Sequence, residues 1–152
     1  MALIADYLDR MIVNTILVAV DGSPASVRAA RAAVGFAHEH VSKVIVLAFS
    51  DCAEGEPAKA KGQTEEVRDS TYLIGEYALK ARIPCEMHVL HSKSPTEDIV
   101  AEATRRHCDL IWLSAPGAAN EAGHYLDTAI TSEVLSKASV PVMLFRSRGA
   151  ET

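Results

Sequence analysis

Two stretches of the chain carry the residue types that bind anions in α/β proteins. In the first, an apolar run at 110–113 passes into the small residues 114–117, and a helix is predicted to begin near Thr128. In the second, the apolar run 15–20 ends at the Asp-Gly-Ser sequence 21–23. Where a buried strand leads through small residues into a helix, free backbone N–H groups point at a ligand and the helix dipole favours negative charge. The two stretches therefore predict an anion-binding crevice.

The elements that must position these stretches alternate along the chain. Apolar, β-branched runs predict strands at 15–20, 43–49, 85–91, 110–113 and 140–145, and helical periodicity predicts helices at 24–40, 64–81, 94–107 and 128–138. Strict alternation predicts an α/β fold, a single doubly wound five-stranded parallel sheet with helices on both faces. In such a sheet a ligand binds beyond the carboxyl ends of the strands, where the strand order reverses.

Local signals refine the ends of these elements. Ser23 and Pro24 suit a helix cap and first turn, and Ser94 to Glu97 matches a capping box. Residues 50–62 contain glycine, proline and charges, which predicts a surface loop. An extra N-terminal amphipathic helix is predicted within residues 1–13, with an apolar stripe that its own domain, a sister subunit or a partner must cover; the stripe consists of Leu3, Ile4, Tyr7, Leu8 and Met11.

Composition limits the class of protein. The 152 residues suit one domain, and the net charge of −5 argues against nucleic acid or an anionic membrane surface as a partner. No apolar run is long enough to span a membrane, and the N-terminus lacks the basic region of a secretory signal. Cys52, Cys85 and Cys108 are widely spaced, which predicts free thiols in a reducing, cytoplasmic compartment.

Several enzyme and metal classes lack their residues. The chain contains no GxxxxGK[ST], GxGxxG or GxSxG motif, so P-loop, dinucleotide and hydrolase chemistry are disfavoured. His88 and His91 are predicted on opposite faces of a strand, so they do not converge on a metal. Trp112 and Cys108 are interpreted as core residues. We therefore predict that the protein is not an enzyme and assign no catalytic residue and no metal ligand.

Three segments together resemble the universal stress protein family. They are ILVAVDGSPASVRAARAAVGFA at 16–37, HSKSPTEDIVAEATRRHCDLIWLS at 91–114 and TSEVLSKASVPVMLFR at 131–146. The resemblance implies a domain over 14–147 with strand order 3-2-1-4-5, which places the crevice beside Asp21 and Ser114. It further implies a role in stress response, ATP binding in many members but not all, and a homodimer formed through the last strand, here through Val140, Val142 and Leu144.

The ATP-binding members carry a glycine, two residues, a second glycine, nine residues, and then glycine followed by serine or threonine. In this chain Ser114 replaces the first glycine, Gly117 keeps the second, and Asp127-Thr128 stands at the closing pair. In an alternative register Thr128-Ala129 closes the loop. Either way the closing glycine is absent, and Asp127 would place a negative charge near the phosphates in the first register.

The other nucleotide-contacting positions of the family are matched better by the residues of this chain. Asp21 matches the acid near the metal or ribose, and Phe49 matches the strand position whose backbone binds adenine. The full predicted nucleotide site is Ala19, Val20, Asp21, Phe49, Leu113, Ser114, Gly117, Thr128, Ala129, Ile130 and Thr131.

Two interpretations of these residues stay open. Asp21 either holds Mg²⁺ through a bound nucleotide or only shapes the Asp-Gly turn, and Thr128 and Thr131 either grip phosphate or cap a helix. We predict a dimeric regulatory protein with weak or no ATP binding, so ATP with Mg²⁺ is a possible cofactor rather than an assigned one. The alternative is a true ATP-binding switch or slow ATPase that uses the same crevice.

Overall fold

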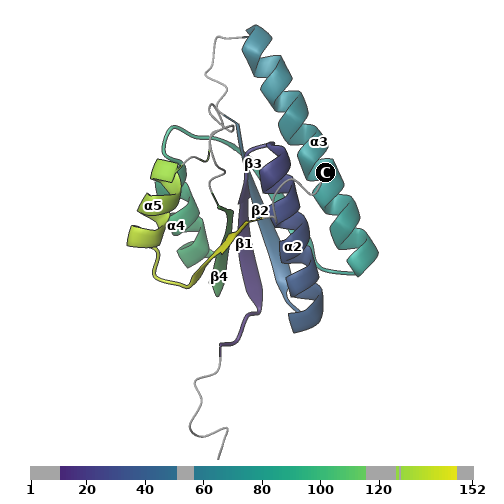
Figure 1. Ribbon diagram of the computed structural model, residues 1–152, viewed down its shortest axis with the longest axis vertical. Helices are drawn as coiled ribbons and strands as arrows, with labels where there is room; N and C mark the ends of the chain where they lie inside the picture. Colours follow the sequence, from purple (N-terminus) through teal and green to yellow (C-terminus); the bar gives the residue numbers. More distant parts are fainter. Residues whose placement is uncertain (1–10, 51–56, 116–125, 127, 147–152) are drawn as a thin grey trace, which may run out of the picture.

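The sheet consists of five parallel strands in the order β3-β2-β1-β4-β5, which confirms the predicted fold. The computed structural model describes residues 11–50, 57–115, 126 and 128–146. The strands are β1 (Thr15–Val20), β2 (Lys43–Ser50), β3 (Cys85–His91), β4 (Leu110–Ser114) and β5 (Val142–Phe145). The strand order reverses between β1 and β4, at the centre of the sheet, as Figure 1 shows.

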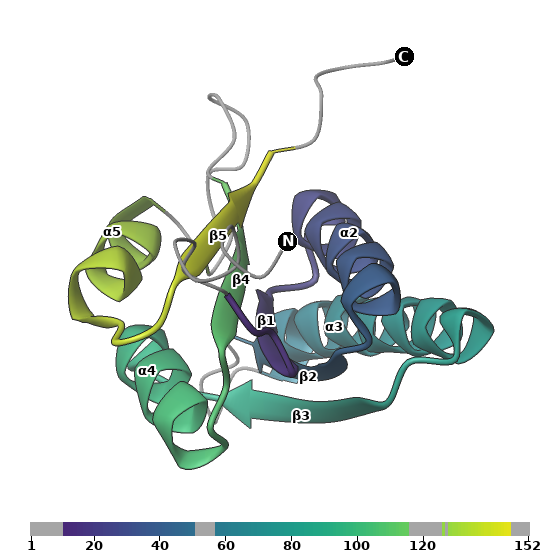
Figure 2. The ribbon, with the colours of Figure 1, turned by 90° about the horizontal axis from the view of Figure 1, so that it is seen from below.

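Helices cover both faces of this sheet. The helices α2 (Pro24–His40) and α3 (Pro57–Ala81) lie on one face, and α4 (Pro95–Arg105) and α5 (Thr128–Lys137) lie on the other (Figure 2). No described helix has the length and apolar composition needed to cross a bilayer.

The alternating side chains of the central strands fill two separate cores. Toward α2 and α3 the buried residues include Val18, Val20 and Trp112. Toward α4 and α5 they include Leu17, Ala19, Ile45, Leu47, Phe49, Ile111 and Leu113. Because both faces are covered by helices, β1, β2 and β4 are apolar along nearly their whole length.

The helix starts follow the predicted signals only in part. The Ser23 hydroxyl accepts a hydrogen bond from the Ser26 N–H at 3.1 Å, and Pro24 occupies the first turn of α2, as predicted. The capping box at α4 was wrong, because the Ser94 side chain makes no cap hydrogen bond. Instead the Glu97 carboxylate accepts a hydrogen bond from its own backbone N–H, which lowers the pKa of Glu97.

Two predicted boundaries need correction. The helix α3 begins at Pro57, so the predicted loop was wrong over 57–62. Proline suits a first helical turn, and the alanines and lysines that follow it have high helix propensity. Their combined preference for a helix outweighs the unfavourable contribution of the single Gly62. The last strand begins at Val142, so Val140 precedes it. Pro141 has no N–H to donate, although its carbonyl already accepts a hydrogen bond from Ile111 at 3.0 Å.

The predicted N-terminal helix and the middle of the loop at 50–62 fall partly on residues 1–10 and 51–56, which lie outside the described residues. Of the N-terminal segment, Met11 and Ile12 are exposed and Val13 is buried.

Three helices are each followed by a residue other than glycine in the left-handed conformation. Val41 (φ 56°) follows α2, Arg82 (φ 58°) follows α3 and His107 (φ 53°) lies beyond α4. The Val41 N–H donates to the carbonyl of Ala37, which closes the last turn of α2. Such a residue satisfies the free carbonyls at a helix end, but it is sterically strained unless it is glycine.

Candidate functional site

The carboxyl end of β1 carries Asp21, whose two carboxylate oxygens both accept backbone hydrogen bonds. Oδ1 accepts from the N–H of Ser23 at 3.0 Å, which forms the predicted turn. Oδ2 accepts from the N–H of Leu126 at 3.2 Å, across a separation of 105 residues. Asp21 therefore joins the β1 turn to the chain just before α5.

A buried serine, Ser26, is hydrogen-bonded to the backbone of Asp21. The N–H of Asp21 donates to the hydroxyl of Ser26 at 3.3 Å, and that hydroxyl donates to the carbonyl of Ser23 at 2.9 Å. Ser23 and Ser26 are both buried. Because both carboxylate oxygens and the backbone N–H of Asp21 are hydrogen-bonded, the orientation of this carboxylate is fixed by the fold.

The end of β4 carries the next residues of the candidate site. Leu113 is buried in the core toward α4 and α5, and Ser114 is half-buried. The N–H of Ala115 donates to the carbonyl of Phe145 at 2.7 Å, so the chain stays attached to β5 one residue past the strand. Gly117 and Asp127 lie outside the described residues.

The first residues of α5 differ in their access to the crevice. Thr128 and Ala129 are exposed, whereas Ile130 packs against the core on the α4 side and Thr131 is buried. The hydroxyl of Thr96 in α4 donates to Glu133 at 2.8 Å, which ties α5 to α4. Of the two predicted phosphate-gripping threonines, only Thr128 is thus available at the surface.

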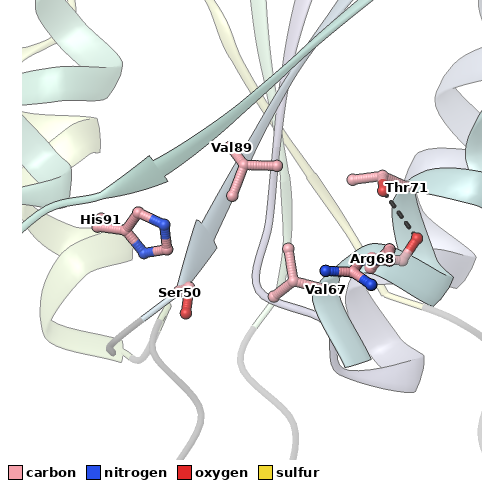
Figure 3. A pocket seen from close by; sticks show the side chains of 6 residues that line it. All are labelled: Ser50, Val67, Arg68, Thr71, Val89 and His91. Carbon is pink, nitrogen blue, oxygen red and sulfur yellow. Dashed lines mark hydrogen bonds between the residues drawn. The ribbon is translucent and has the colours of Figure 1, made fainter. Parts of the chain in front are cut away.

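On the β2 side, a cavity of about 230 Å³ opens next to the predicted adenine position. Phe49 itself is fully buried, and the cavity begins at the following residue, Ser50. It lies between α3 and the carboxyl ends of β2 and β3, and its walls are formed by Ser50, Val67, Arg68, Thr71, Val89 and His91 (Figure 3).

Two basic side chains flank this cavity. Figure 3 shows Arg68 of α3 and His91 of β3 on opposite sides of it, with Val67 and Val89 between them. Among the described residues, neither side chain has a hydrogen-bond or ion-pair partner. The cavity therefore combines apolar walls with an arginine and a histidine, which are side chains that can bind an anionic or polar ligand.

Part of this arrangement of site residues is predicted by the sequence. The prediction placed Asp21, Phe49 and Ser114 at one edge of the sheet, and the strand order confirms that placement. It missed Leu126 and Arg68, for which the sequence carried no signal. His91 could have been found, because it ends a strand whose carboxyl end lies at the same edge.

The described cysteine, histidine and carboxylate side chains do not form a metal site. In the described part of the chain, no three His, Cys, Asp or Glu side chains converge as metal ligands do. Trp112 and Cys108 are buried, as predicted. Burial, with a smaller contribution from Asp109, raises the pKa of Cys108 to about 11, so its thiol stays protonated.

The strand order and the helices on both faces define a doubly wound α/β domain, and Asp21 and Ser114 of the candidate site lie at the switch point of its sheet. A family model described as the universal stress protein family matches residues 13–146, and the chain belongs to that family. No curated protein matches the chain in sequence.

Solved structures agree with this fold. A protein of the universal stress protein family from Burkholderia pseudomallei superposes with a TM-score of 0.68 at 17% identity, covering 90% of this chain and 98% of that one. A universal stress protein in complex with cAMP gives a TM-score of 0.68 at 20% identity, with 90% and 99% coverage. The universal stress protein from Archaeoglobus fulgidus in complex with dAMP gives 0.63 at 24%, with 88% and 98% coverage.

Proposed function

We propose that this chain is a dimeric, cytoplasmic stress-response regulator that binds adenine nucleotides weakly, without a catalytic role. The neighbours solved with cAMP and dAMP support an adenine nucleotide as the ligand class. The altered loop, with Ser114 and Asp127 in place of glycines, supports a weakened grip on phosphate.

The observation that carries the proposal is the hydrogen bonding of Asp21. Both of its oxygens already accept backbone N–H groups, one of them from Leu126 at the entry to α5. A Mg²⁺ ion that approaches this carboxylate must share Oδ2 with the Leu126 N–H, because each oxygen already accepts one hydrogen bond. This sharing reduces the negative charge available to the metal, which lowers the affinity for ATP with Mg²⁺ more than the affinity for a nucleotide bound without metal.

The cavity beyond Phe49 supports the nucleoside part of the proposal. In the proposed mode the base lies against the backbone of Phe49, and the cavity next to it gives the base room between Val67 and Val89. Arg68 supplies a positive charge that the phosphate loop lacks, and His91 adds a ring nitrogen that can form a hydrogen bond with a ligand. A nucleoside monophosphate or a cyclic nucleotide, which carries less charge than ATP, is therefore the expected ligand.

Calorimetry tests this proposal with ATP, AMP and cAMP, each with and without Mg²⁺. The expected order is tighter binding of AMP or cAMP than of ATP.

The variant S114G/D127G restores the glycines in the first register, and S114A/D127A is its matched control, which removes the charge without adding glycine. A unit charge near phosphate costs on the order of 1–4 kcal/mol, so removing it should strengthen ATP binding by roughly fivefold or more. Absence of binding by every nucleotide, in both variants, would refute the nucleotide proposal.

The dimer is proposed to form through β5. This strand is at the edge of the sheet opposite β3, and its carbonyls at Pro141 and Phe145 point toward β4. Since backbone groups alternate along a strand, the N–H of Leu144 points to the outer edge, where a second copy can pair with it. L144P removes that donor, and L144A is the control that keeps it. Sedimentation should show dissociation of L144P alone, and an unchanged dimer would exclude pairing through this edge.

A further inference from the structure

The face of β5 on the α2 side has no helix packed along it among the described elements. The strand β5 has extensive contacts only with β4. Met143 pairs in register with Trp112 and is 39% exposed, and the rings of Trp112 and Phe145 stack with centroids 6.4 Å apart. Phe36 of α2 borders the same rings, with its centroid 5.4 Å from that of Trp112. We call this set, Phe36, Trp112, Met143 and Phe145, the β5 face.

Within the β5 face, the indole N–H of Trp112 has no hydrogen-bond acceptor among the described residues. Trp112 is only 4% exposed, so this unpaired Nε1 atom is buried. An indole nitrogen only donates, and a buried donor without an acceptor is unfavourable. In the described part of the chain, the β5 face therefore leaves Met143 without an apolar cover and Trp112 without an acceptor.

The chain that precedes β1 is held next to β4. A single carboxylate oxygen of Asp109, at the start of β4, accepts the N–H groups of Asn14 and Thr15 at 2.8 and 3.0 Å. Val13 is buried in the same core as Trp112. The segment that precedes residue 11 therefore joins the domain at the end of the sheet where β1 and β4 begin. It does so on the α2 side of the sheet, which is also the side of the β5 face.

We propose that residues 2–10 form an amphipathic helix whose apolar stripe packs on the β5 face of the same chain. Leu3, Ile4, Tyr7 and Leu8 of the predicted stripe lie on one side of such a helix, and Met11, which is exposed and outside a helix in the structure, does not belong to the packed part. Nine helical residues span about 14 Å and the four residues of β5 span about 13 Å, so the lengths match. The last carbonyls of a helix lack partners within it, and one of them, or the Tyr7 hydroxyl, accepts the Trp112 N–H. The outer edge of β5 stays free for a second copy.

Trp112 is the only tryptophan in the chain, so its fluorescence reports on the β5 face directly. In the full chain, I4K/Y7K places charges in the apolar stripe, and A2K/A5K adds the same charge on the other side of the helix. We expect I4K/Y7K, but not A2K/A5K, to shift Trp112 emission to longer wavelength and to raise its quenching by acrylamide. Deletion of residues 2–10 should reproduce the shift with the sheet intact by circular dichroism.

The alternative occupants give different results. Unchanged emission and quenching in both I4K/Y7K and the deletion would overturn the proposal. If the shift appears only together with dissociation of the dimer in sedimentation, the segment covers a sister subunit, and the assignment to the same chain is wrong. M143K tests the face itself and should reproduce the effect of I4K/Y7K, with no further change when the two are combined.

Discussion

The end of α2 offers a direct test of how strain is distributed in this fold. Val41 adopts φ 56° and ψ 51° and is 87% exposed, so it has the left-handed conformation with almost none of its side chain in contact with the protein. A β-branched residue is the least suited to this conformation. We predict that V41G stabilises the protein.

The magnitude follows from three contributions. Removing the left-handed penalty of an L-residue gains about 1–2 kcal/mol. The greater freedom of glycine in the unfolded chain costs about 0.5–1 kcal/mol. The side chain is nearly exposed, so its loss costs only a few tenths of a kcal/mol on the scale of ~1.5–3 kcal/mol for full burial. The net gain is therefore about 0.5 kcal/mol, which corresponds to a rise in melting temperature of roughly 1–2 °C for a domain of this size.

Thermal and urea unfolding of V41G, V41A and the unmodified protein measure this gain. V41A keeps the Cβ atom and should remain less stable than V41G. As an internal control, Gly35 lies in the interior of α2 and an added Cβ would meet nothing within 4 Å, so G35A should stabilise by about 0.5–1 kcal/mol. Glycine should therefore be favoured at position 41 and alanine at position 35. Equal stability of V41G and V41A would refute the strain argument.

Two further predictions concern ionisable groups. Glu86 accepts a hydrogen bond from Lys43 at 2.6 Å and another from Arg106 at 2.7 Å; the bond from Lys43, followed by His88, lowers the pKa of Glu86. A lowered carboxylate pKa adds stability that is present at neutral pH and lost as pH falls through the native pKa; E86Q should therefore be less stable near neutral pH and lose less stability on acidification, as urea titrations at several pH values will show. Cys108, whose pKa is raised to about 11 by burial, should react with a thiol reagent at pH 8 only as fast as the protein unfolds, and a fast native reaction at Cys108 by mass spectrometry would contradict its burial.

The sheet could be predicted from sequence because its signals are local and redundant. Strands such as Thr15–Val20 are apolar at nearly every position, which is expected only when helices cover both faces. The order of the strands, in contrast, came from the resemblance to a family, since alternation alone permits several orders. The error at Pro57 arose because glycine and charges were interpreted as a loop where proline begins a helix.

For the candidate site, the sequence predicts which edge of the sheet carries the residues, but not the contacts that they make there. The sequence indicates that Asp21 and Ser114 end neighbouring strands, but the partner of Asp21 Oδ2 is a backbone N–H at Leu126, and backbone groups are the same in every residue. The position of Arg68 beside His91 depends on how α3 packs on the sheet, which the helical pattern of α3 does not encode.

The bond between Asp21 and Leu126 joins the candidate site to the chain just before α5. If a ligand binds as proposed and displaces the Leu126 N–H from Oδ2 of Asp21, the entry to this helix is released. The helix α5 is also joined to α4 through Thr96 and Glu133 at 2.8 Å and through Glu97 and Lys137 at 3.2 Å. If the bond at the start of α5 is released while its bonds to α4 remain, the first turn of α5 can change conformation and the rest of the helix stays attached to the domain. A ligand that binds weakly at Asp21 would then still change the surface formed by Thr128 and Ala129, so low affinity is compatible with a regulatory role.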